Sequence, residues 1–206
     1  HLEQAGATIF YGQKASNIID GIDVVVYTAA IREDNEEFKA AVEKGLPMLS
    51  RAELLGQLMT NYDVPIAVSG THGKTTTSTM AAHLLHQSKV GCNAFLGGIS
   101  KNYGTNLLLS DTSEYVVIEA DEFDRSFHWL TPFATVITAT DADHLDIYGT
   151  EEAYLESFNH YTSLIQPGGA LIMRKGIKLQ PRLQERGCGV RYWMILPMPC
   201  QLQSHC

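Results

Sequence analysis

The segment that most constrains the fold of this chain is GTHGKTT, at positions 70–76. It follows an apolar run at 65–69 and precedes a helical pattern that continues to about Gln87. A glycine-rich turn between a strand and a helix lets backbone N–H groups and the helix N-terminus surround a polyphosphate. The segment therefore predicts a phosphate loop within a parallel α/β sheet.

Two side chains of this loop have specific expected roles. Lys74 would reach the β- and γ-phosphates of a nucleotide, and the Thr75 hydroxyl would contact Mg²⁺. The general pattern GxxxxGK[ST] requires glycine where this chain has Val68, so Gly70 marks a variant of the motif. A turn that only caps a helix is the alternative interpretation. The residues expected to contact the nucleotide are Gly70, Thr71, His72, Gly73, Lys74, Thr75 and Thr76.

Strand and helix patterns alternate along most of the chain, which predicts parallel βαβ units. We expect strands at 23–28, 65–69, 115–119, 134–138 and 170–173, and helices at 51–60, 74–87 and 150–165. Asp34 is expected to cap a further helix that ends near Gly45. The 74–87 helix is expected to bury Met80, Leu84 and Leu85. After residue 174 the pattern decays and predicts no element.

Composition excludes several functional classes. The chain has 206 residues with 15 basic and 23 acidic side chains, a net charge of −8, which argues against a general nucleic-acid binder. No apolar run approaches the roughly 20 residues that span a bilayer, which argues against membrane insertion.

Because the chain begins at His1 without an initiator Met, we expect it to be a piece of a longer protein. The cysteines form no regular framework, which favours a reducing compartment; they are Cys92, Cys188, Cys200 and Cys206.

Polar segments follow two more of the predicted strands, at 119–124 and 141–146. Ligands of open α/β sheets bind at the carboxyl ends of strands, so both segments are expected near the phosphate loop. We assign Glu119 to a metal ion and His144 to a cation or a transferring phosphate. Loop structure remains an equal alternative for the other acidic residues of the first segment, Asp121, Glu122 and Asp124. The glycine- and asparagine-rich segment 97–106 is expected to be a loop, with contact to a polar substrate as one of two open interpretations.

Taken in order, the segments 70–76, 97–106, 119–132 and 141–149 resemble those of the Mur ligases. Residues 28–59 also resemble the end of the nucleotide-sugar domain in that family, and the resemblance continues to about residue 174. It implies an α/β chain with two incomplete domains. Residues 1–61 would end a Rossmann-like nucleotide-sugar domain, residues 62–174 would belong to a parallel-sheet ATP-binding domain with a phosphate loop, and residues 175–206 would form an unmatched tail.

The resemblance implies a cytoplasmic, ATP-dependent amide ligase of peptidoglycan synthesis, and the sequence EADEFDRSF fits the alanine-adding branch. ATP would phosphorylate the carboxylate of UDP-N-acetylmuramate, and L-alanine would attack the acyl phosphate. Lys74, Glu119 and His144 would be catalytic, with Thr75 and Glu119 holding one Mg²⁺ and His144 serving a second. The residues implied in substrate contact are Gly98, Asn102, Thr105, Asn106, Arg125 and Ser126.

Two alternatives to this function remain open. One is the branch of the family that recycles a tripeptide onto the same nucleotide sugar, and the other is a nucleotide-binding module without catalysis. Branches that use a carbamoylated lysine fit less well, because no lysine lies between Lys101 and Lys175. The resemblance also implies that the amino-acid-binding domain is missing, so we expect the 206-residue chain alone to be inactive.

Overall fold

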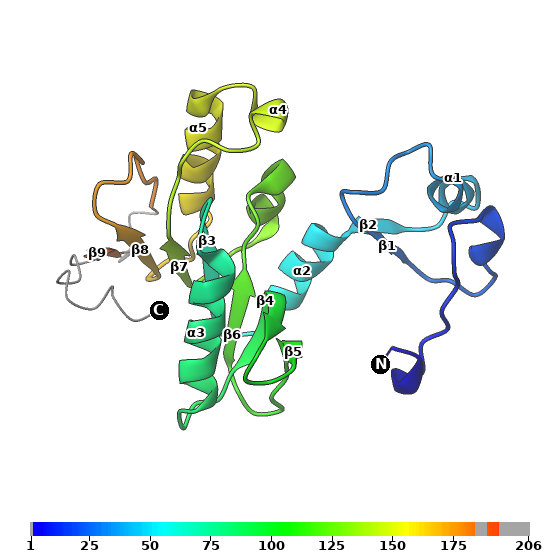
Figure 1. The fold of residues 1–206 in the computed structure, drawn as a ribbon, viewed down its shortest axis with the longest axis horizontal. Helices are drawn as coiled ribbons and strands as arrows, with labels where there is room; N and C mark the ends of the chain where they lie inside the picture. The colour runs from blue at the N-terminus through cyan, green and yellow to red at the C-terminus, as the bar shows by residue number, and fades with distance from the viewer. Residues whose placement is uncertain (1, 184–188, 194–206) are drawn as a thin grey trace, which may run out of the picture. The chain divides into compact units, whose positions relative to one another are not determined.

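The structure, a computed structural model, describes residues 2–183 and 189–193. By internal contacts the chain divides into two compact units, His1–Leu55 and Gly56–Cys206, so the boundary falls within the helix α2 (Arg51–Met59). Figure 1 shows the order of the elements along the chain. Among the described residues, no helix combines the length and apolar character needed to cross a membrane.

The first unit contains a small parallel sheet of β1 (Val25–Tyr27) and β2 (Met48–Ser50), joined through α1 (Glu36–Glu43). Two short 3-10 helices precede it, η1 (Glu3–Ala5) and η2 (Ala15–Asn17). The strand expected at 23–28 is confirmed in its central part. The expected cap is wrong, because Asn35 rather than Asp34 has the extended backbone of an N-cap. Its side-chain oxygen accepts hydrogen bonds from the backbone N–H groups of Glu37 and Phe38, at 2.9 and 3.1 Å.

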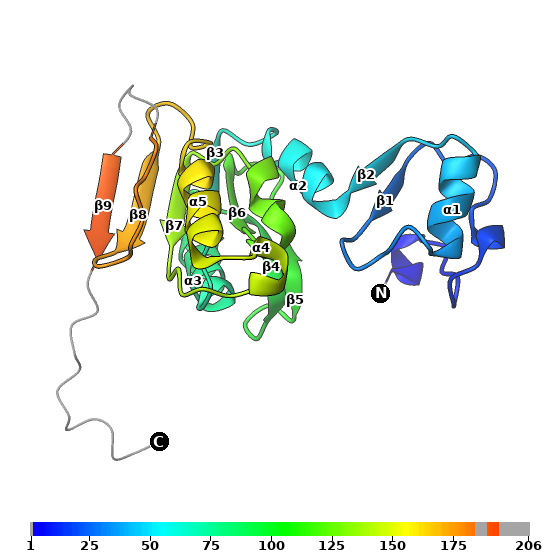
Figure 2. The ribbon, with the colours of Figure 1, turned by 90° about the horizontal axis from the view of Figure 1, so that it is seen from above.

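The described part of the second unit contains a seven-stranded sheet of order β5-β4-β6-β3-β7-β8-β9, which Figure 2 shows from β9 on the left to β5. Adjacent strands are parallel except for the antiparallel pair β4–β5. The strands are β3 (Val64–Ser69), β4 (Asn93–Ser100), β5 (Thr105–Leu108), β6 (Tyr115–Glu119), β7 (Ala134–Ile137), β8 (Ala170–Arg174) and β9 (Gly189–Trp193). The helices are α3 (Lys74–His86), η3 (Phe123–Trp129), α4 (Leu145–Tyr148) and α5 (Glu151–Thr162).

Most predicted elements of this unit are confirmed, including β6 with the bounds expected for it. The helix expected at 74–87 ends one residue earlier, at His86. The helix expected at 150–165 is shorter, with Thr150 as its N-cap, where the hydroxyl accepts a hydrogen bond from the N–H of Ala153. The parallel α/β class therefore follows the alternating pattern of the sequence.

The interpretation of residues 97–106 as one loop is wrong, because β4 continues to Ser100 and β5 begins at Thr105. The two strands form a hairpin that buries Leu96 and Leu108 in a core cluster with Val117 of β6. Glycines normally weaken a strand, but they are found where another group approaches the backbone closely. Two glycines of β4 have such neighbours, because the Glu119 carboxylate lies against Gly97 and the Thr75 methyl group lies against Gly98.

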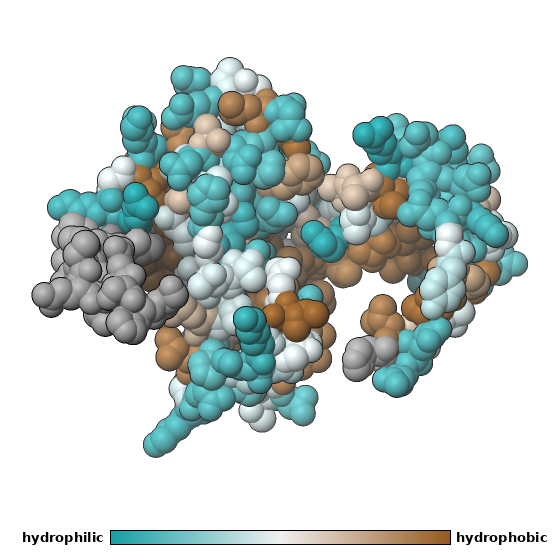
Figure 3. All heavy atoms as spheres, viewed as in Figure 1, coloured by the Kyte–Doolittle hydropathy of each residue, from teal (hydrophilic) through white to brown (hydrophobic). Residues whose placement is uncertain are grey.

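The predicted inner face of α3 is partly wrong. Met80 and Leu84 are 61% and 68% exposed, and of the three predicted residues only Leu85 packs against the core. The buried residues of α3 are the small Ser78 and Ala82, which allow the helix to lie close to the strands. Figure 3 shows hydrophobic residues exposed among hydrophilic ones on one face of the molecule.

A second core region connects α5 to η3 and β7. The Phe127 ring stacks on Tyr161 with centroids 4.5 Å apart and meets Phe158 edge-on at 5.0 Å. The buried Tyr161 hydroxyl lies 3.3 Å from the Thr135 hydroxyl of β7. Because aromatic contacts of this kind bury a large apolar area, they fix the segment after β6 against the sheet.

The carboxyl-terminal tail contains one described strand, β9, in the part of the sequence where the pattern predicts no element. It pairs in parallel with β8, with Gly189 beside Ala170. Two parts of the tail, at 184–188 and 194–206, lie outside the described residues, and they contain Cys188, Cys200 and Cys206. Cys92 is buried and free, and burial raises the pKa of its thiol to about 11.

Gly56 of α2 gives a prediction about this fold. A helix-interior glycine usually costs about 1 kcal/mol relative to alanine, so Gly→Ala normally stabilises. Here a Cβ would lie 2.3 Å from the backbone oxygen of Trp129. We therefore expect Gly56→Ala to lower the free energy of unfolding by about 1–3 kcal/mol in a urea titration. The exposed neighbour Gln57 provides the control. Gln57→Ala is expected to change the free energy of unfolding by less than about 0.5 kcal/mol. A stabilised Gly56→Ala variant would contradict the packing described.

Candidate functional site

The strand order brings the three loops after β3, β6 and β7 to one edge of the sheet. β3 lies between β6 and β7, and all three strands are parallel, so their carboxyl ends point the same way. In register, Val68 lies beside Glu119 of β6, and Ser69 lies beside Ile137 of β7. The adjacent β4 is parallel to β6 as well. The predicted meeting of the phosphate loop with the segments at 119–124 and 141–146 is therefore confirmed.

The phosphate loop fits closely against the end of β7. Gly70 has φ of 125°, a conformation that side chains of L residues rarely adopt. A Cβ at this position would also lie 2.4 Å from the Thr138 hydroxyl and 2.7 Å from the carbonyl oxygen of Ala139. The N–H of Thr71 donates to that same carbonyl at 3.0 Å. Glycine is therefore required here by both conformation and space.

The Thr138 hydroxyl anchors the backbone at the start of the phosphate loop. Its hydroxyl lies 2.5 Å from the carbonyl oxygen of His72 and 3.1 Å from that of Ser69, and its N–H donates to Ser69 as well. The Ser69 hydroxyl is itself buried and makes no hydrogen bond within the part of the chain that the structure describes. One threonine directly after β7 thus fixes two carbonyl groups on either side of Gly70.

The Thr71 side chain joins the loop to α5. Its hydroxyl donates to the carbonyl of Asp141 at 2.8 Å and lies 2.9 Å from the Tyr154 hydroxyl. Burial raises the pKa of Tyr154, so this phenol stays protonated. Thr71 therefore serves the shape of the loop through its side chain, while its backbone belongs to the predicted phosphate site.

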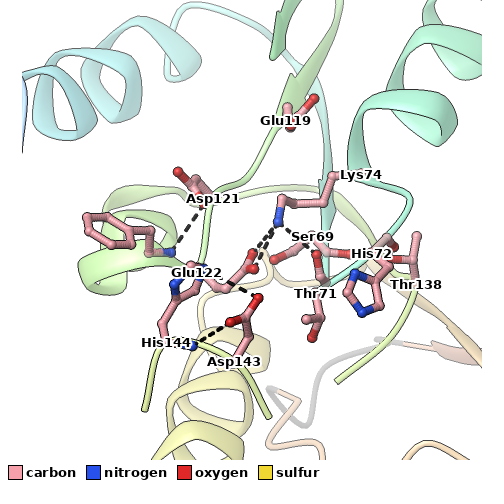
Figure 4. A network of polar contacts seen from close by, with 12 residues as sticks. Ser69, Thr71, His72, Lys74, Glu119, Asp121, Glu122, Thr138, Asp143 and His144 are labelled. Atoms are coloured by element: carbon pink, nitrogen blue, oxygen red, sulfur yellow. Dashed lines mark hydrogen bonds and ion pairs between the residues drawn. The ribbon is translucent and has the colours of Figure 1, made fainter. Parts of the chain in front are cut away.

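Lys74 forms a largely buried ion pair with Glu122, which Figure 4 shows together with the surrounding loops. The ammonium nitrogen lies 2.9 and 2.8 Å from the two carboxylate oxygens and 2.9 Å from the carbonyl oxygen of Gly70. The Lys74 and Glu122 side chains are 17% and 1% exposed. Burial raises the pKa of the Glu122 carboxyl, although Lys74 acts to lower it. The burial of Glu122 argues against the interpretation as a solvated loop residue, and its contact with Lys74 leaves a role as a metal ligand a prediction.

The backbone around Glu122 is fixed by its own contacts. The Tyr148 hydroxyl and the N–H of Arg125 both donate to the Glu122 carbonyl. Asp124 and Arg125 have φ of 49° and 58°, an uncommon conformation outside glycine. The Arg125 guanidinium lies 4.7 Å from the centroid of the Tyr148 ring, a cation–π contact. These contacts hold the Glu122 carboxylate in place against Lys74.

Glu119 lies beside Thr75, as the predicted metal site requires. The Thr75 hydroxyl donates to the Glu119 carboxylate at 3.0 Å, as does the N–H of Gly97 at 3.0 Å, and the Ser78 hydroxyl lies 3.4 Å away. A Cβ on Gly97 would lie 2.3 Å from a carboxylate oxygen, so glycine in β4 leaves room for Glu119. The hydroxyl and carboxylate oxygens are hard ligands of the kind Mg²⁺ prefers.

His144 is less closely connected to this pair. Its backbone has φ of 53°, its N–H donates to the Asp143 carboxylate at 2.8 Å, and its ring meets Phe123 edge-on at 5.2 Å. Within the described residues no hydrogen bond joins His144 to Thr75 or Glu119. Nor do three or more His, Cys, Asp or Glu residues in that part of the chain form a metal-binding group. Mg²⁺ is commonly held by one or two carboxylates together with substrate phosphates and water, so Thr75 and Glu119 fit one ion, and the role of His144 stays a prediction.

The residues expected to contact the substrate fall into two groups. Gly98 lies at the phosphate-loop side of the hairpin, where a Cβ would be 3.2 Å from the Thr75 methyl group. Arg125, on the Tyr148 ring, and the half-buried Ser126 follow Glu122. The second group lies in and after the β4–β5 turn and comprises Asn102, Thr105 and Asn106.

The second group makes local contacts. The Asn102 amide lies 3.4 Å from the His83 ring, whose Nδ1 also lies 2.7 Å from the Tyr103 hydroxyl. The Thr105 hydroxyl accepts a hydrogen bond from a backbone N–H within β5, and Asn106 is exposed. None of these contacts reaches the phosphate loop, so substrate contact by this group stays a prediction.

A cavity of about 250 Å³ lies at the carboxyl ends of β7 and β8. The residues directly after Thr138 form part of its wall, and its lining contains charged side chains of both signs. Its lining residues, none of them among the predicted site residues, are Ala139, Thr140, Asp141, Ala142, Glu151, Leu155, Arg174, Gly176, Ile177 and Lys178.

Sequence reasoning did not assign four residues that shape the site: Ser78, Gly97, Glu122 and Thr138. Glu122 lies in a segment already identified, three positions after Glu119, which was the available signal for it. Ser78 lies three positions after Thr75, which is a weak signal because every helix contains many pairs with this spacing. The contacts of Gly97 and Thr138 depend on strand pairing and leave no mark in the local pattern.

The chain matches two known domain families. Residues 68–191 match the Mur ligase middle domain, and residues 1–63 match the catalytic domain of the Mur ligase family. The match to the middle domain extends beyond residue 174, where the resemblance was expected to end. The UDP-N-acetylmuramate–L-alanine ligase of Phocaeicola vulgatus is 65% identical over 188 residues, which cover 89% of this chain and 41% of the relative. The chain thus spans about two fifths of that relative's length.

Two of the solved structures that resemble this one are Mur ligases. The UDP-N-acetylmuramate–alanine ligase of Thermotoga maritima aligns with a TM-score of 0.75 and 29% identity over 86% of this chain and 40% of that one. The UDP-N-acetylmuramate:L-alanyl-gamma-D-glutamyl-meso-diaminopimelate ligase of Neisseria meningitides aligns with a TM-score of 0.81 over 93% of this chain and 64% of that one. At 24% identity, the second comparison supports the fold alone.

Thr138 gives a prediction about the phosphate loop. Thr138→Val keeps a similar shape but removes the hydroxyl that lies against Ser69 and His72. We expect the free energy of unfolding to fall by about 1 kcal/mol and the amides of residues 71–74 to exchange faster with deuterium. Thr135→Val is the matched control, because Thr135 is buried in β7, three residues before Thr138, but contacts Tyr161 instead. Unchanged amide exchange at residues 71–74 in Thr138→Val would contradict this role, as would equally faster exchange of the same amides in Thr135→Val.

Proposed function

Because the chain belongs to the Mur ligase family, we propose that it is the nucleotide-binding part of an ATP-dependent ligase that joins L-alanine to UDP-N-acetylmuramate. Relatives from Phocaeicola vulgatus and Parabacteroides distasonis, 65% and 55% identical, carry the name of that activity. The observation that carries the proposal is the meeting of Lys74, Thr75 and Glu119 at the phosphate loop. The buried, unpaired Cys92 is consistent with a reducing compartment, and we propose a cytoplasmic location.

In this function the phosphate loop binds and orients the triphosphate. Its backbone N–H groups and the N-terminus of α3 attract the phosphate oxygens, and the Lys74 ammonium stabilises negative charge on the β- and γ-phosphates. Mg²⁺, when bound, neutralises charge on the phosphate oxygens, and Thr75 and Glu119 would hold it. The contribution of these residues is electrostatic stabilisation and positioning, which dominate catalysis of phosphoryl transfer.

The proposed reaction has two steps. A carboxylate oxygen of UDP-N-acetylmuramate bonds to the γ-phosphorus of ATP, and the bond from that phosphorus to ADP breaks. The amine of L-alanine then bonds to the acyl carbon, phosphate leaves, and the nitrogen loses a proton. We propose that His144 acts near the transferring phosphate or serves a second Mg²⁺. The proposed substrate contacts are Gly98, Asn102, Thr105, Asn106, Arg125 and Ser126.

Replacing Lys74 tests this function. We expect Lys74→Ala, in the complete ligase that contains this chain, to lower amide formation at least about 100-fold, because its charge acts on the transferring phosphate. The affinity for UDP-N-acetylmuramate should change less than about twofold, because Lys74 acts on ATP. Product formation from ATP, Mg²⁺, UDP-N-acetylmuramate and L-alanine is measured by mass spectrometry.

The exposed Lys89 provides the control, with Lys89→Ala expected to retain normal turnover. Near-normal turnover of Lys74→Ala would contradict the role of the phosphate loop. A second set of reactions offers a tripeptide in place of L-alanine. Product from the tripeptide but not from L-alanine would contradict the proposed substrate and favour the recycling branch.

Glu119 and His144 give a separate prediction about metal dependence. Glu119→Ala removes the carboxylate beside Thr75, so turnover should fall and higher Mg²⁺ should restore part of it. His144→Ala should also lower turnover, through loss of its contact with phosphate or a second ion. Turnover is measured as a function of Mg²⁺ concentration for each variant. Normal activity with unchanged Mg²⁺ dependence in both would show that these residues have only structural roles.

A further inference from the structure

The Lys74 ammonium is fully engaged within the protein. A lysine ammonium has three N–H donors and no acceptor. Three oxygens lie within hydrogen-bond distance of it, the Gly70 carbonyl at 2.9 Å and the two Glu122 carboxylate oxygens at 2.9 and 2.8 Å (Figure 4). A phosphate that binds Lys74 must therefore take over at least one of these hydrogen bonds.

We propose that Glu122 is a positioning residue that competes with the nucleotide phosphates for Lys74. It holds the ammonium at the phosphate loop before the nucleotide binds and yields part of that contact to the phosphates. The inference rests on the proposed function, because it requires a phosphorylated ligand at this loop. It adds a specific role for Glu122, which sets how strongly Lys74 attracts the ligand.

Of the two partners, Lys74 is the one able to change its contacts. The Glu122 side chain is 1% exposed, and the Tyr148 hydroxyl and the Arg125 N–H fix its backbone. Lys74 is 17% exposed, and its long side chain begins at the first residue of α3, directly at the loop. The carboxylate therefore stays in place, while the ammonium turns toward the phosphates.

The charges of the pair predict the direction of the effect. With Glu122 ionised, the pair has no net charge, so a phosphate approaching the loop meets a lysine that is already neutralised. Glu122→Gln keeps nearly the same shape and one oxygen acceptor but leaves the Lys74 charge uncompensated. The variant should therefore attract phosphates more strongly, and its affinity should depend more steeply on salt, because an uncompensated charge is screened by ions.

A purely structural role for Glu122 predicts the opposite. In that case Glu122→Gln would loosen the loop and weaken the binding of every nucleotide, with or without a triphosphate. AMP separates the two roles, because it lacks the β- and γ-phosphates that Lys74 serves. The matched control is Asp121→Asn, which removes one charge from the same loop. The Asp121 carboxylate accepts a hydrogen bond from the N–H of Phe123, which asparagine preserves. Among the described residues, the hydrogen bonds of the Lys74 ammonium go to Gly70 and Glu122.

The test is calorimetric titration of the 206-residue chain and both variants with MgATP and with AMP, at low and high salt. We expect Glu122→Gln to bind MgATP about five- to tenfold more tightly at low salt and to lose this gain at high salt. Its affinity for AMP, and both affinities of Asp121→Asn, should stay within about twofold of the unchanged chain. Unchanged or weaker MgATP binding by Glu122→Gln, an equal gain for AMP, or an equal gain in Asp121→Asn would overturn the proposal.

A second measurement covers the case in which Glu122→Gln does not fold. The ¹⁵Nζ signal of Lys74 in the unchanged chain should shift on addition of MgATP and stay in place with AMP. No shift with MgATP bound would overturn the proposal without any variant. If the unchanged chain binds no MgATP at all, the nucleotide site in the proposed function fails and this inference fails with it. Binding without the effects above overturns the role of Glu122 alone.

Discussion

The parallel pairing of β3 with both β6 and β7 is the constraint on which the rest of the second unit depends. It places three chain segments at one sheet edge, and each segment then fixes the next through short polar contacts. Thr138 after β7 holds Ser69 at the end of β3 and His72 of the phosphate loop, and Glu122 after β6 holds Lys74. The site is therefore a consequence of strand order, and any change that shifts these strands would separate its parts.

Close packing around charged groups is the second feature of this edge. Glycine at 70 and at 97 lets the Thr138 hydroxyl and the Glu119 carboxylate approach the backbone more closely than any side chain would allow. The Glu122 carboxylate is buried against the Lys74 ammonium. A buried pair contributes little net stability, but removing one partner leaves an uncompensated charge, so such a pair is sensitive to whatever else binds its partner. This sensitivity connects the architecture to the proposed competition for Lys74.

The sequence predicts the elements whose pattern is local. The apolar run at 115–119 predicts β6, and the helical pattern after the glycine-rich loop predicts α3. The position of Glu119 follows from the rule that ligands bind at strand ends. The sequence did not predict the hairpin at 93–108, because its glycines are typical of loops. The structure gives a reason for two of them, since Glu119 lies against Gly97 and the Thr75 methyl group lies against Gly98. Glu122 was found as part of a segment but without a role, because burial and pairing with Lys74 exist only after folding.

The central claim, that the segments after β3, β6 and β7 form one nucleotide site, is tested most directly by amide ¹H–¹⁵N spectra of the chain titrated with MgATP. The account predicts concerted shifts in residues 70–76, 119–122 and 138–144, with a single saturation curve, because strand pairing joins these segments at one edge. Shifts confined to one of the three segments, or shifts in other parts of the chain with none at the phosphate loop, would contradict it.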